Sequence, residues 1–225
     1  SNYTPAIAAV PRRAEQNQLL LAFPGITYAE ERCTLGIMNA VLGGSGSSRL
    51  YRRLRDELGL CYDVESFDMT WAETGLFGIG AGLPPENEKR AIAAITEELL
   101  RFLDEGPGES ELRRARAQAE AGLVLGGESS LARMRRLGQA ELFLPRVMST
   151  DELLERYNAV TRGDVLDLAR SLMDFSQLSL PARQRGRIRK IAAPALKKAL
   201  HFLLPPGYTM PALYPGRPGT AAGGN

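Results

Sequence analysis

The sequence holds few of the residues that build metal sites or covalent frameworks. Its 225 residues include one histidine, His201, and two cysteines, Cys33 and Cys61. A catalytic zinc site needs about three His, Cys or carboxylate ligands and an open water position. We therefore expect no metal and no other cofactor in this chain, with His201 an incidental surface residue. The cysteines lack the spacing of a metal motif and are expected as buried thiols, with a disulfide between them as the alternative.

Long apolar runs are absent as well. No stretch approaches the ~20 apolar residues that span a bilayer, and residues 1–18 mix charged and polar residues where a signal peptide would be apolar. Hydrophobic residues make up 44% and charged residues 24% of the chain, which is typical of a globular protein with a sizeable core. We predict no membrane span and a cytoplasmic location, although the sequence leaves the localisation open.

Acidic residues are missing from the C-terminal part. After Asp174 the chain has no Asp or Glu but eight of its 28 Lys and Arg residues, whereas residues 1–174 carry 20 basic and 26 acidic residues, a balance of −6. Proline, glycine and alanine accumulate in the same part. The composition predicts a lead-in at residues 1–14, a globular domain at residues 15–180 and a basic, flexible tail at residues 181–225.

Apolar periodicity and breaker residues predict the order of elements. Strands are predicted over residues 18–23, 62–70, 75–83 and 177–180. Helices are predicted over residues 28–42, 49–58, 86–104, 109–125, 129–144 and 161–172, with a short one opening at Thr150. Thr27 and Glu30 have the spacing of a capping box for the first helix. Because strands and helices do not alternate regularly, we predict an α+β fold, with helices packed on one face of a mainly antiparallel sheet.

Two blocks of sequence carry a family resemblance. The first is Gly-Gly-Ser-Gly-Ser-Ser-Arg-Leu at residues 43–50, followed by Leu-Arg-Asp-Glu-Leu-Gly-Leu-Cys-Tyr at residues 54–62. The second lies within residues 127–142, and Tyr-Asn-Ala-Val-Thr-Arg-Gly-Asp-Val at residues 157–165 agrees with it. These blocks resemble the M16 family of zinc peptidases (pitrilysin, insulinase and processing-peptidase type), and more narrowly its C-terminal, non-metal-binding domain. The resemblance covers about residues 15–180, and the sequence departs from the family pattern from Pro181 onward.

The resemblance implies a division of labour between two similar domains that face each other around a chamber. One domain carries His-x-x-Glu-His and a further Glu as zinc ligands. The other lacks this motif and supplies an Arg and a Tyr that reach across to the substrate, which by motif position are Arg55 and Tyr62 here. The resemblance thus implies that zinc lies on a partner domain or subunit, and that the substrate is an extended peptide.

An Arg and a Tyr suit the hydrolysis of a peptide bond. Attack of water on the carbonyl builds negative charge on its oxygen, and a guanidinium or phenol donor aimed at that oxygen stabilises the transition state. A helix end and a strand start would hold Arg55 and Tyr62 near one rim. The structural alternatives are a solvated helix arginine and a half-buried strand aromatic. Arg49 is interpreted as structural, tying down the Gly/Ser loop at residues 43–48, which lacks the pattern of a phosphate-binding loop.

Three functions follow as hypotheses. The chain is the non-metal half of a peptidase, paired with a zinc-bearing M16 N-terminal domain or subunit and inactive alone, with the strand at residues 18–23 as a site for peptide addition. The alternative is a catalytically inactive scaffold or structural subunit, and a homodimer is a further partner option. Nucleic-acid binding by the basic tail ranks last, because the tail has no interleaved aromatic residues and no nucleic-acid-binding motif.

Overall fold

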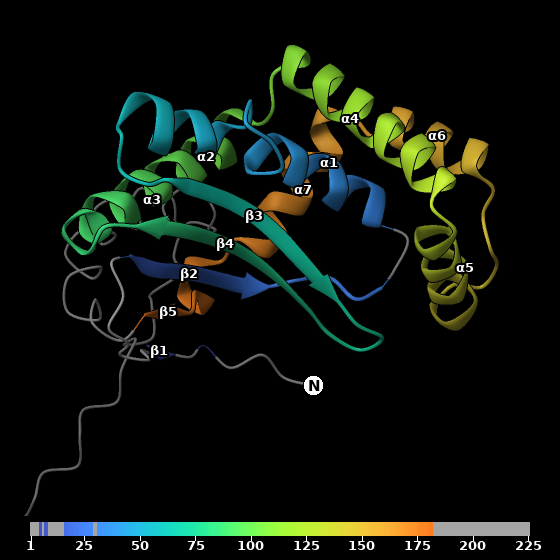
Figure 1. The fold of residues 1–225 in the computed structure, drawn as a ribbon, viewed down its shortest axis with the longest axis horizontal. Coiled ribbons are helices and arrows are strands. Elements are labelled where there is room, and N and C mark those ends of the chain that lie inside the picture. Colours follow the sequence, from blue (N-terminus) through green and yellow to red (C-terminus); the bar gives the residue numbers. More distant parts are fainter. Residues whose placement is uncertain (1–4, 6, 9–15, 29–30, 182–225) are drawn as a thin grey trace, which may run out of the picture.

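The computed structural model describes residue 5 and residues 7–8, 16–28 and 31–181. The predicted tail at residues 181–225, including His201, therefore lies almost wholly outside the described residues, and its interpretation stays a prediction. The described part is an α+β domain with an antiparallel sheet and helices packed on one face of it (Figure 1). The predicted fold class is confirmed.

The sheet consists of β2 (Asn17–Pro24), β3 (Asp63–Thr70) and β4 (Gly75–Leu83), with β4 in the centre and antiparallel to both neighbours. Alternate residues of β4 are buried under the helices, and Phe77 and Ile79 are fully inaccessible. Phe77 stands opposite Phe23 of β2, and Ile79 stands opposite Leu21. This alternation is the period of a strand with one buried face, and it explains why the strand predicted over residues 75–83 agrees with β4.

The helices follow in the predicted order, with one change of type. They are α1 (Arg32–Leu42), α2 (Arg49–Tyr51), α3 (Glu88–Glu105), α4 (Glu109–Glu128), α5 (Ser130–Phe143), α6 (Thr150–Ala159) and α7 (Arg162–Leu172). The helix predicted over residues 49–58 is α-helical only at its start and continues as a π-helix over Arg52–Glu57. Short 3₁₀ turns cover Pro85–Asn87 and Phe175–Gln177.

The core lies between the sheet and its helices. Helix α3 contributes Ile92, Ile95, Leu99 and Phe102, whose spacing of three and four residues puts them on one face of the helix. These side chains belong to the same cluster of buried apolar residues as Phe77 of the sheet. Burial of one such large side chain stabilises the fold by about 1.5–3 kcal/mol, so this interface fixes the sheet against the helices.

The first helix begins later than predicted. Its N-cap position is Glu31, without a capping side-chain bond, so the prediction of Thr27 as the cap is wrong, and Glu30 lies outside the described residues. The backbone N–H of Tyr28 donates to the carbonyl of Trp71 at 2.9 Å, and that of Gly25 donates to Gly75 at 2.9 Å. These bonds hold the preceding segment against the β3–β4 hairpin, which prevents it from entering the helix.

Other boundaries follow capping side chains. Helix α4 continues through Gly126 and Gly127, which were expected to interrupt it, and its C-cap is Ser129. The same serine is the N-cap of α5, where its hydroxyl accepts a hydrogen bond from the N–H of Ala132. Helix α7, which was predicted to start at Thr161, begins with a capping box of Thr161 and Asp164. Helix α6 has an equivalent box formed by Ser149 and Glu152, one residue before the predicted opening.

The last predicted strand is wrong at its start. Gln177 belongs to a 3₁₀ turn, and pairing begins at Ser179, which exchanges backbone hydrogen bonds with Ala22 of β2 at 3.2 and 2.8 Å. The next two residues form β5 (Leu180–Pro181), which pairs in parallel with β1 (Ile7–Ala8). The outer edge of β2 is therefore occupied at Ala22, which restricts the room for a peptide to add along this strand.

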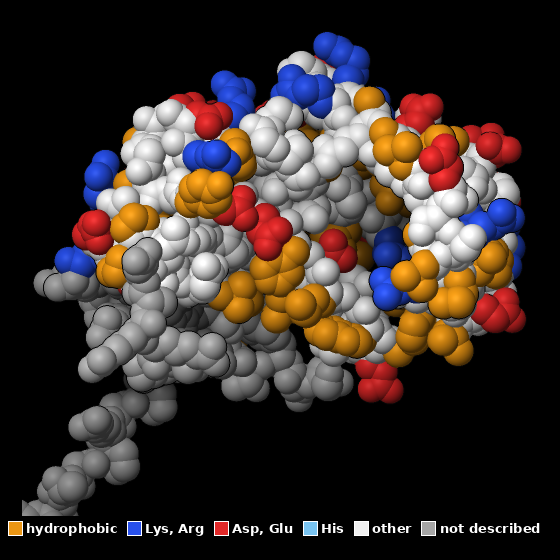
Figure 2. Space-filling view, in the orientation of Figure 1, with side chains coloured by type: hydrophobic (Ala, Val, Ile, Leu, Met, Phe, Trp, Pro, Cys, Tyr) orange, Lys and Arg blue, Asp and Glu red, His pale blue; other side chains and the backbone are white. Residues whose placement is uncertain are grey.

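The outer helices expose an apolar surface. Large exposed hydrophobic side chains are concentrated on the C-terminal half of α4, on α5 and on the loop after it (Val124, Leu125, Leu131, Met134, Leu137, Leu142, Phe143 and Val147). Figure 2 shows hydrophobic side chains gathered over α5. Apolar surface of this kind is characteristic of protein contacts. Among the described residues, no helix combines the length and the apolar character needed to cross a membrane.

Candidate functional site

Arg55 and Tyr62 come from two adjacent elements. Arg55 lies in the π-helix, and Tyr62 is the residue immediately before β3. The backbone N–H of Tyr62 donates to the carbonyl of Gly82 at 3.0 Å, which fixes the start of the strand against β4. The Tyr62 side chain is 70% exposed, whereas Arg55 is half-buried. A phenol this open has its hydroxyl available to a molecule outside the domain.

A tight reversal of the chain brings the two side chains together. Gly59 adopts a φ of +58°, which favours glycine, and its N–H donates to the carbonyl of Arg55 at 3.2 Å. The N–H of Leu60 donates to the carbonyl of Leu54 at 2.8 Å and closes the turn. As a result, the guanidinium carbon of Arg55 lies 5.2 Å from the ring centre of Tyr62, within the range of a cation–π contact.

A third residue of this group was missed by sequence reasoning. Tyr51 lies one turn before Arg55, and its hydroxyl accepts a hydrogen bond from Nη1 of Arg55. The guanidinium carbon of Arg55 also lies 4.8 Å from the ring centre of Tyr51. The spacing of four residues was the available signal, because side chains at i and i+4 on a helix are neighbours.

Cys61 lies beside this group but is not suited to be a nucleophile. Burial, and to a smaller extent the negative charge of Asp63, raise the pKa of its thiol to about 11, although the charge of Arg55 acts in the opposite direction. A thiol with this pKa stays protonated near neutral pH, and the thiolate is the reactive form. Both cysteines are free and buried, as expected.

The group can donate hydrogen bonds but does not include a metal site. In the part of the chain that the structure describes, no three His, Cys, Asp or Glu residues lie close enough together to hold a metal ion. A guanidinium and a phenol can stabilise negative charge on an oxygen. They do not by themselves activate water for attack.

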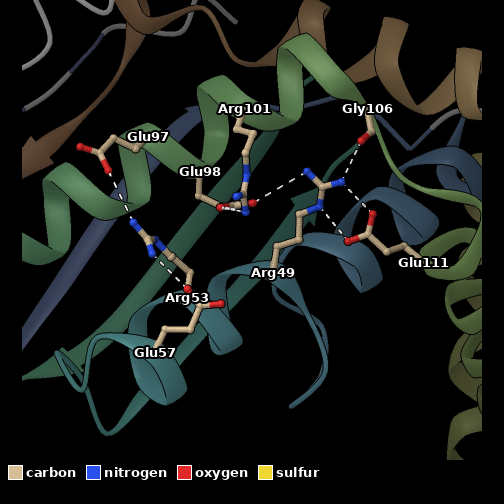
Figure 3. A network of polar contacts seen from close by, with 8 residues as sticks. All are labelled: Arg49, Arg53, Glu57, Glu97, Glu98, Arg101, Gly106 and Glu111. Atoms are coloured by element: carbon tan, nitrogen blue, oxygen red, sulfur yellow. Dashed lines mark hydrogen bonds and ion pairs between the residues drawn. The ribbon is translucent and has the colours of Figure 1, made fainter.

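Arg49 is structural, but its partners differ from the prediction (Figure 3). It does not bind the Gly/Ser loop. Its Nε and Nη2 donate to the two carboxylate oxygens of Glu111 on α4, at 2.8 and 2.7 Å, and Nη2 also donates to the carbonyl of Gly106 at 2.8 Å. Nη1 lies 3.8 Å from Oε1 of Glu98 on α3, a residue with a side chain only 2% exposed. Arg49 therefore joins α2, α3 and α4.

Other residues hold the Gly/Ser loop. The carbonyl of Gly44 accepts a hydrogen bond from Nε2 of Gln118 on α4 at 2.9 Å, and the hydroxyls of Ser45 and Ser47 lie 3.2 Å apart. At Gly43 an added Cβ would lie 2.2 Å from the backbone nitrogen of Ser66, so the end of α1 packs directly on β3. The loop is thus tied to the domain at several points.

The fold and the site define a class: an α+β domain that presents an Arg–Tyr donor pair with an exposed tyrosine, and with no metal-binding cluster among its described residues. A family model described as the peptidase M16 inactive domain matches residues 2–119, and the chain belongs to the peptidase M16 family. An uncharacterized zinc protease of Streptomyces coelicolor is 35% identical over 168 residues, which cover 74% of this chain and 37% of that protein. The chain thus spans well under half the length of the curated relatives it matches.

Solved structures share the fold. A crystal structure of a peptidase M16 inactive domain from Pseudomonas fluorescens matches with a TM-score of 0.70 and 20% identity, over 79% of this chain and 43% of that chain. The inactive peptidase domain of a protein named as a zinc protease from Bordetella parapertussis matches with a TM-score of 0.63 and 21% identity, over 76% of this chain and 94% of that chain. At this identity, the two likenesses concern the fold alone.

Proposed function

We propose that the chain is the non-metal half of an M16-type zinc peptidase, which binds an extended peptide and supplies Arg55 and Tyr62 to an active site whose zinc lies on a companion domain. The observation that carries this proposal is that the guanidinium carbon of Arg55 lies 5.2 Å from the ring centre of Tyr62, whose phenol is exposed to solvent. The family of the chain supports it, since its relatives are named as zinc proteases.

The roles of the two side chains follow from their chemistry. The zinc site of the companion domain would supply the activated water. The Tyr62 hydroxyl would donate to the carbonyl oxygen of the scissile bond as negative charge develops there. The Arg55 guanidinium would add a fixed positive charge beside it and offer further N–H donors to peptide carbonyls. Both groups would act more strongly on the transition state than on the uncharged substrate, so they would affect turnover more than binding.

A companion domain is also consistent with the surface of the molecule. The helices α4 and α5 expose several large apolar side chains, as protein contact surfaces do, and the curated relatives are about twice as long as this chain. Two-domain assembly around a shared cleft would explain both observations. The partners in this proposal are the zinc-bearing companion domain and the peptide substrate, with a homodimer as a further option.

The isolated chain should be free of zinc and unable to hydrolyse peptides. The purified protein would be dialysed, its metal content measured by mass spectrometry, and its activity assayed with casein and a fluorogenic peptide. Hydrolysis should appear when an M16 domain that contains His-x-x-Glu-His, encoded with or beside this chain, is added. Tightly held zinc or hydrolysis by the isolated chain would overturn the proposal, and a stable but inactive mixture would favour the scaffold function.

Tyr62→Phe should lower kcat in the reconstituted peptidase by about 2 kcal/mol of transition-state stabilisation or more, roughly 30-fold, because one donor to the developing oxyanion is lost. KM should change little. Because Tyr62 is 70% exposed, the thermal midpoint of the variant should match that of the wild type. Tyr157→Phe, which removes a hydroxyl close to Gly36 on α1, provides the matched control and should keep full turnover. Wild-type kcat in Tyr62→Phe would remove Tyr62 from the mechanism.

A further inference from the structure

The Arg55 side chain contacts two aromatic rings, one partly buried and one exposed. Its guanidinium carbon lies 4.8 Å from the ring centre of Tyr51 and 5.2 Å from that of Tyr62. Tyr62 is 70% exposed, so its ring gives little restraint by itself. Tyr51 is partly buried and packs against the core, and it also receives the hydrogen bond from Nη1 of Arg55. The fixed support for Arg55 is therefore Tyr51.

The position of Tyr51 is itself determined by packing. It is the last residue of α2, where the α-helix gives way to the π-helix that carries Arg55. Its Cε1 lies 3.7 Å from the position of a Cβ at Gly46, so the Gly/Ser loop packs on one side of the ring. The wider turn of a π-helix shifts the residues after it relative to a regular helix, and such turns are frequent at functional sites.

The chemistry of the partner matters more than the contact alone. An arginine is usually held by a carboxylate, which neutralises its charge. Among the described residues no carboxylate forms an ion pair with Arg55, and the hydrogen-bond acceptor is the neutral phenol of Tyr51. A neutral acceptor restrains the guanidinium without neutralising its positive charge. One N–H is used by Tyr51, and the remaining N–H donors of the guanidinium stay available.

On the basis of the proposed function, we propose that Tyr51 is a positioning residue for the reaction: its hydroxyl and ring hold the Arg55 guanidinium beside Tyr62, without an ion-pair partner and with its remaining donors left for the substrate. Tyr51 does not touch the substrate. It acts through Arg55. Because Tyr51 already restrains the arginine side chain before the reaction, less conformational entropy is lost when the transition state forms.

The first test measures Arg55 in the isolated chain, with no peptidase activity required. In the wild type, ¹⁵N NMR of the guanidinium groups should show slowed rotation of the Arg55 guanidinium, because Nη1 is held by Tyr51. Tyr51→Phe keeps the ring and removes the acceptor, and it should restore fast rotation while the circular dichroism spectrum stays unchanged. Tyr28→Phe is the matched control, because Arg32 lies 3.9 Å over the Tyr28 ring away from this site, and it should leave the Arg55 signals unaltered.

The second test uses the reconstituted peptidase. Tyr51→Phe should lower kcat about tenfold with KM unchanged, the scale of one hydrogen bond from a charged donor, and Tyr51→Leu should lower it further. Unaltered Arg55 signals in Tyr51→Phe would overturn the inference, and so would altered signals with wild-type kcat. These outcomes are distinct from failure of the proposed function, which would appear as wild-type turnover in Tyr62→Phe.

Discussion

Arg49→Ala should lower the free energy of unfolding by about 3–5 kcal/mol, the cost of removing one partner from a buried ion pair. Arg49 is only 11% exposed, and it is the common partner of Glu98 and Glu111, which are 2% and 18% exposed (Figure 3). Without the arginine, both carboxylates would stay in a poorly solvated site, and the carbonyl of Gly106 would lose a donor. Urea unfolding followed by circular dichroism would measure the change.

The matched control is Arg53→Ala, which removes an arginine from the following π-helix that lies outside the buried Arg49 group. Arg53 pairs with Glu57 at 3.0 Å, but the two side chains are 35% and 49% exposed. Exposed pairs contribute about 0–1 kcal/mol, so this variant should unfold within about 1 kcal/mol of the wild type. Equal losses in the two variants would show that burial of Arg49 is not the source of its effect.

The Arg49 group also predicts a pH dependence. Burial opposes ionisation of Glu111, but the hydrogen bonds from Arg49 and from the N–H of Gly108, together with the charge of Arg49, outweigh burial and lower the pKa of Glu111 below its usual 4.5. A carboxyl with a lowered pKa in the folded state stabilises the fold above its unfolded pKa, and this stabilisation is lost as the pH falls through the folded-state value. The difference in stability between the wild type and Arg49→Ala should therefore narrow as the pH falls below about 4.5.

Gly75→Ala should lower the free energy of unfolding by about 3 kcal/mol, because the site has no room for a methyl group. A Cβ at Gly75 would lie 1.8 Å from the carbonyl oxygen of Ile26 and 2.9 Å from the carbonyl carbon of Gly25. Both are backbone atoms, and Gly25 is held in place by its hydrogen bond to the carbonyl of Gly75. Relief of the contact requires separation of this segment from the β3–β4 hairpin. Urea unfolding again measures the loss.

Gly126→Ala is the control with the opposite sign. Gly126 lies inside α4, and no heavy atom lies within 4 Å of its added Cβ. Alanine is a better helix former than glycine, so this variant should be more stable than the wild type by about 0.5 kcal/mol. A stable Gly75→Ala variant would mean that the Gly25–Ile26 segment can move away from the hairpin at little cost.

Local sequence patterns were sufficient for the elements that carry a clear period. The alternating apolar residues of β4 and the spacing of Ile92, Ile95 and Leu99 in α3 each identify one buried face. The predicted start at Thr161 agreed with α7 within one residue. These features depend on residues close together in the chain, so they could be predicted without the tertiary structure.

The candidate site was only partly predictable. The positions of Arg55 and Tyr62 were identified from motif resemblance, and their roles remain a proposal. The π-helix and the support from Tyr51 were not predicted, because a π-helix differs from an α-helix by a small shift in hydrogen bonding. At the end of this turn the N–H of Leu60 donates to the carbonyl of Leu54, and both leucine side chains are buried in the core. The late start of α1 was missed for a similar reason, since the bonds of Gly25 and Tyr28 are made to the hairpin.

The sequence by itself determined the α+β class, the antiparallel hairpin and the shortage of histidine and cysteine that argues against a zinc site of its own. Only the tertiary structure decided that Arg49 binds Glu98 and Glu111, and that Arg55 contacts two tyrosine rings. The physical reason is range. The period of a strand or a helix can be recognised from residues close together in the sequence. The partner of a long polar side chain depends on which elements the packed core brings beside it.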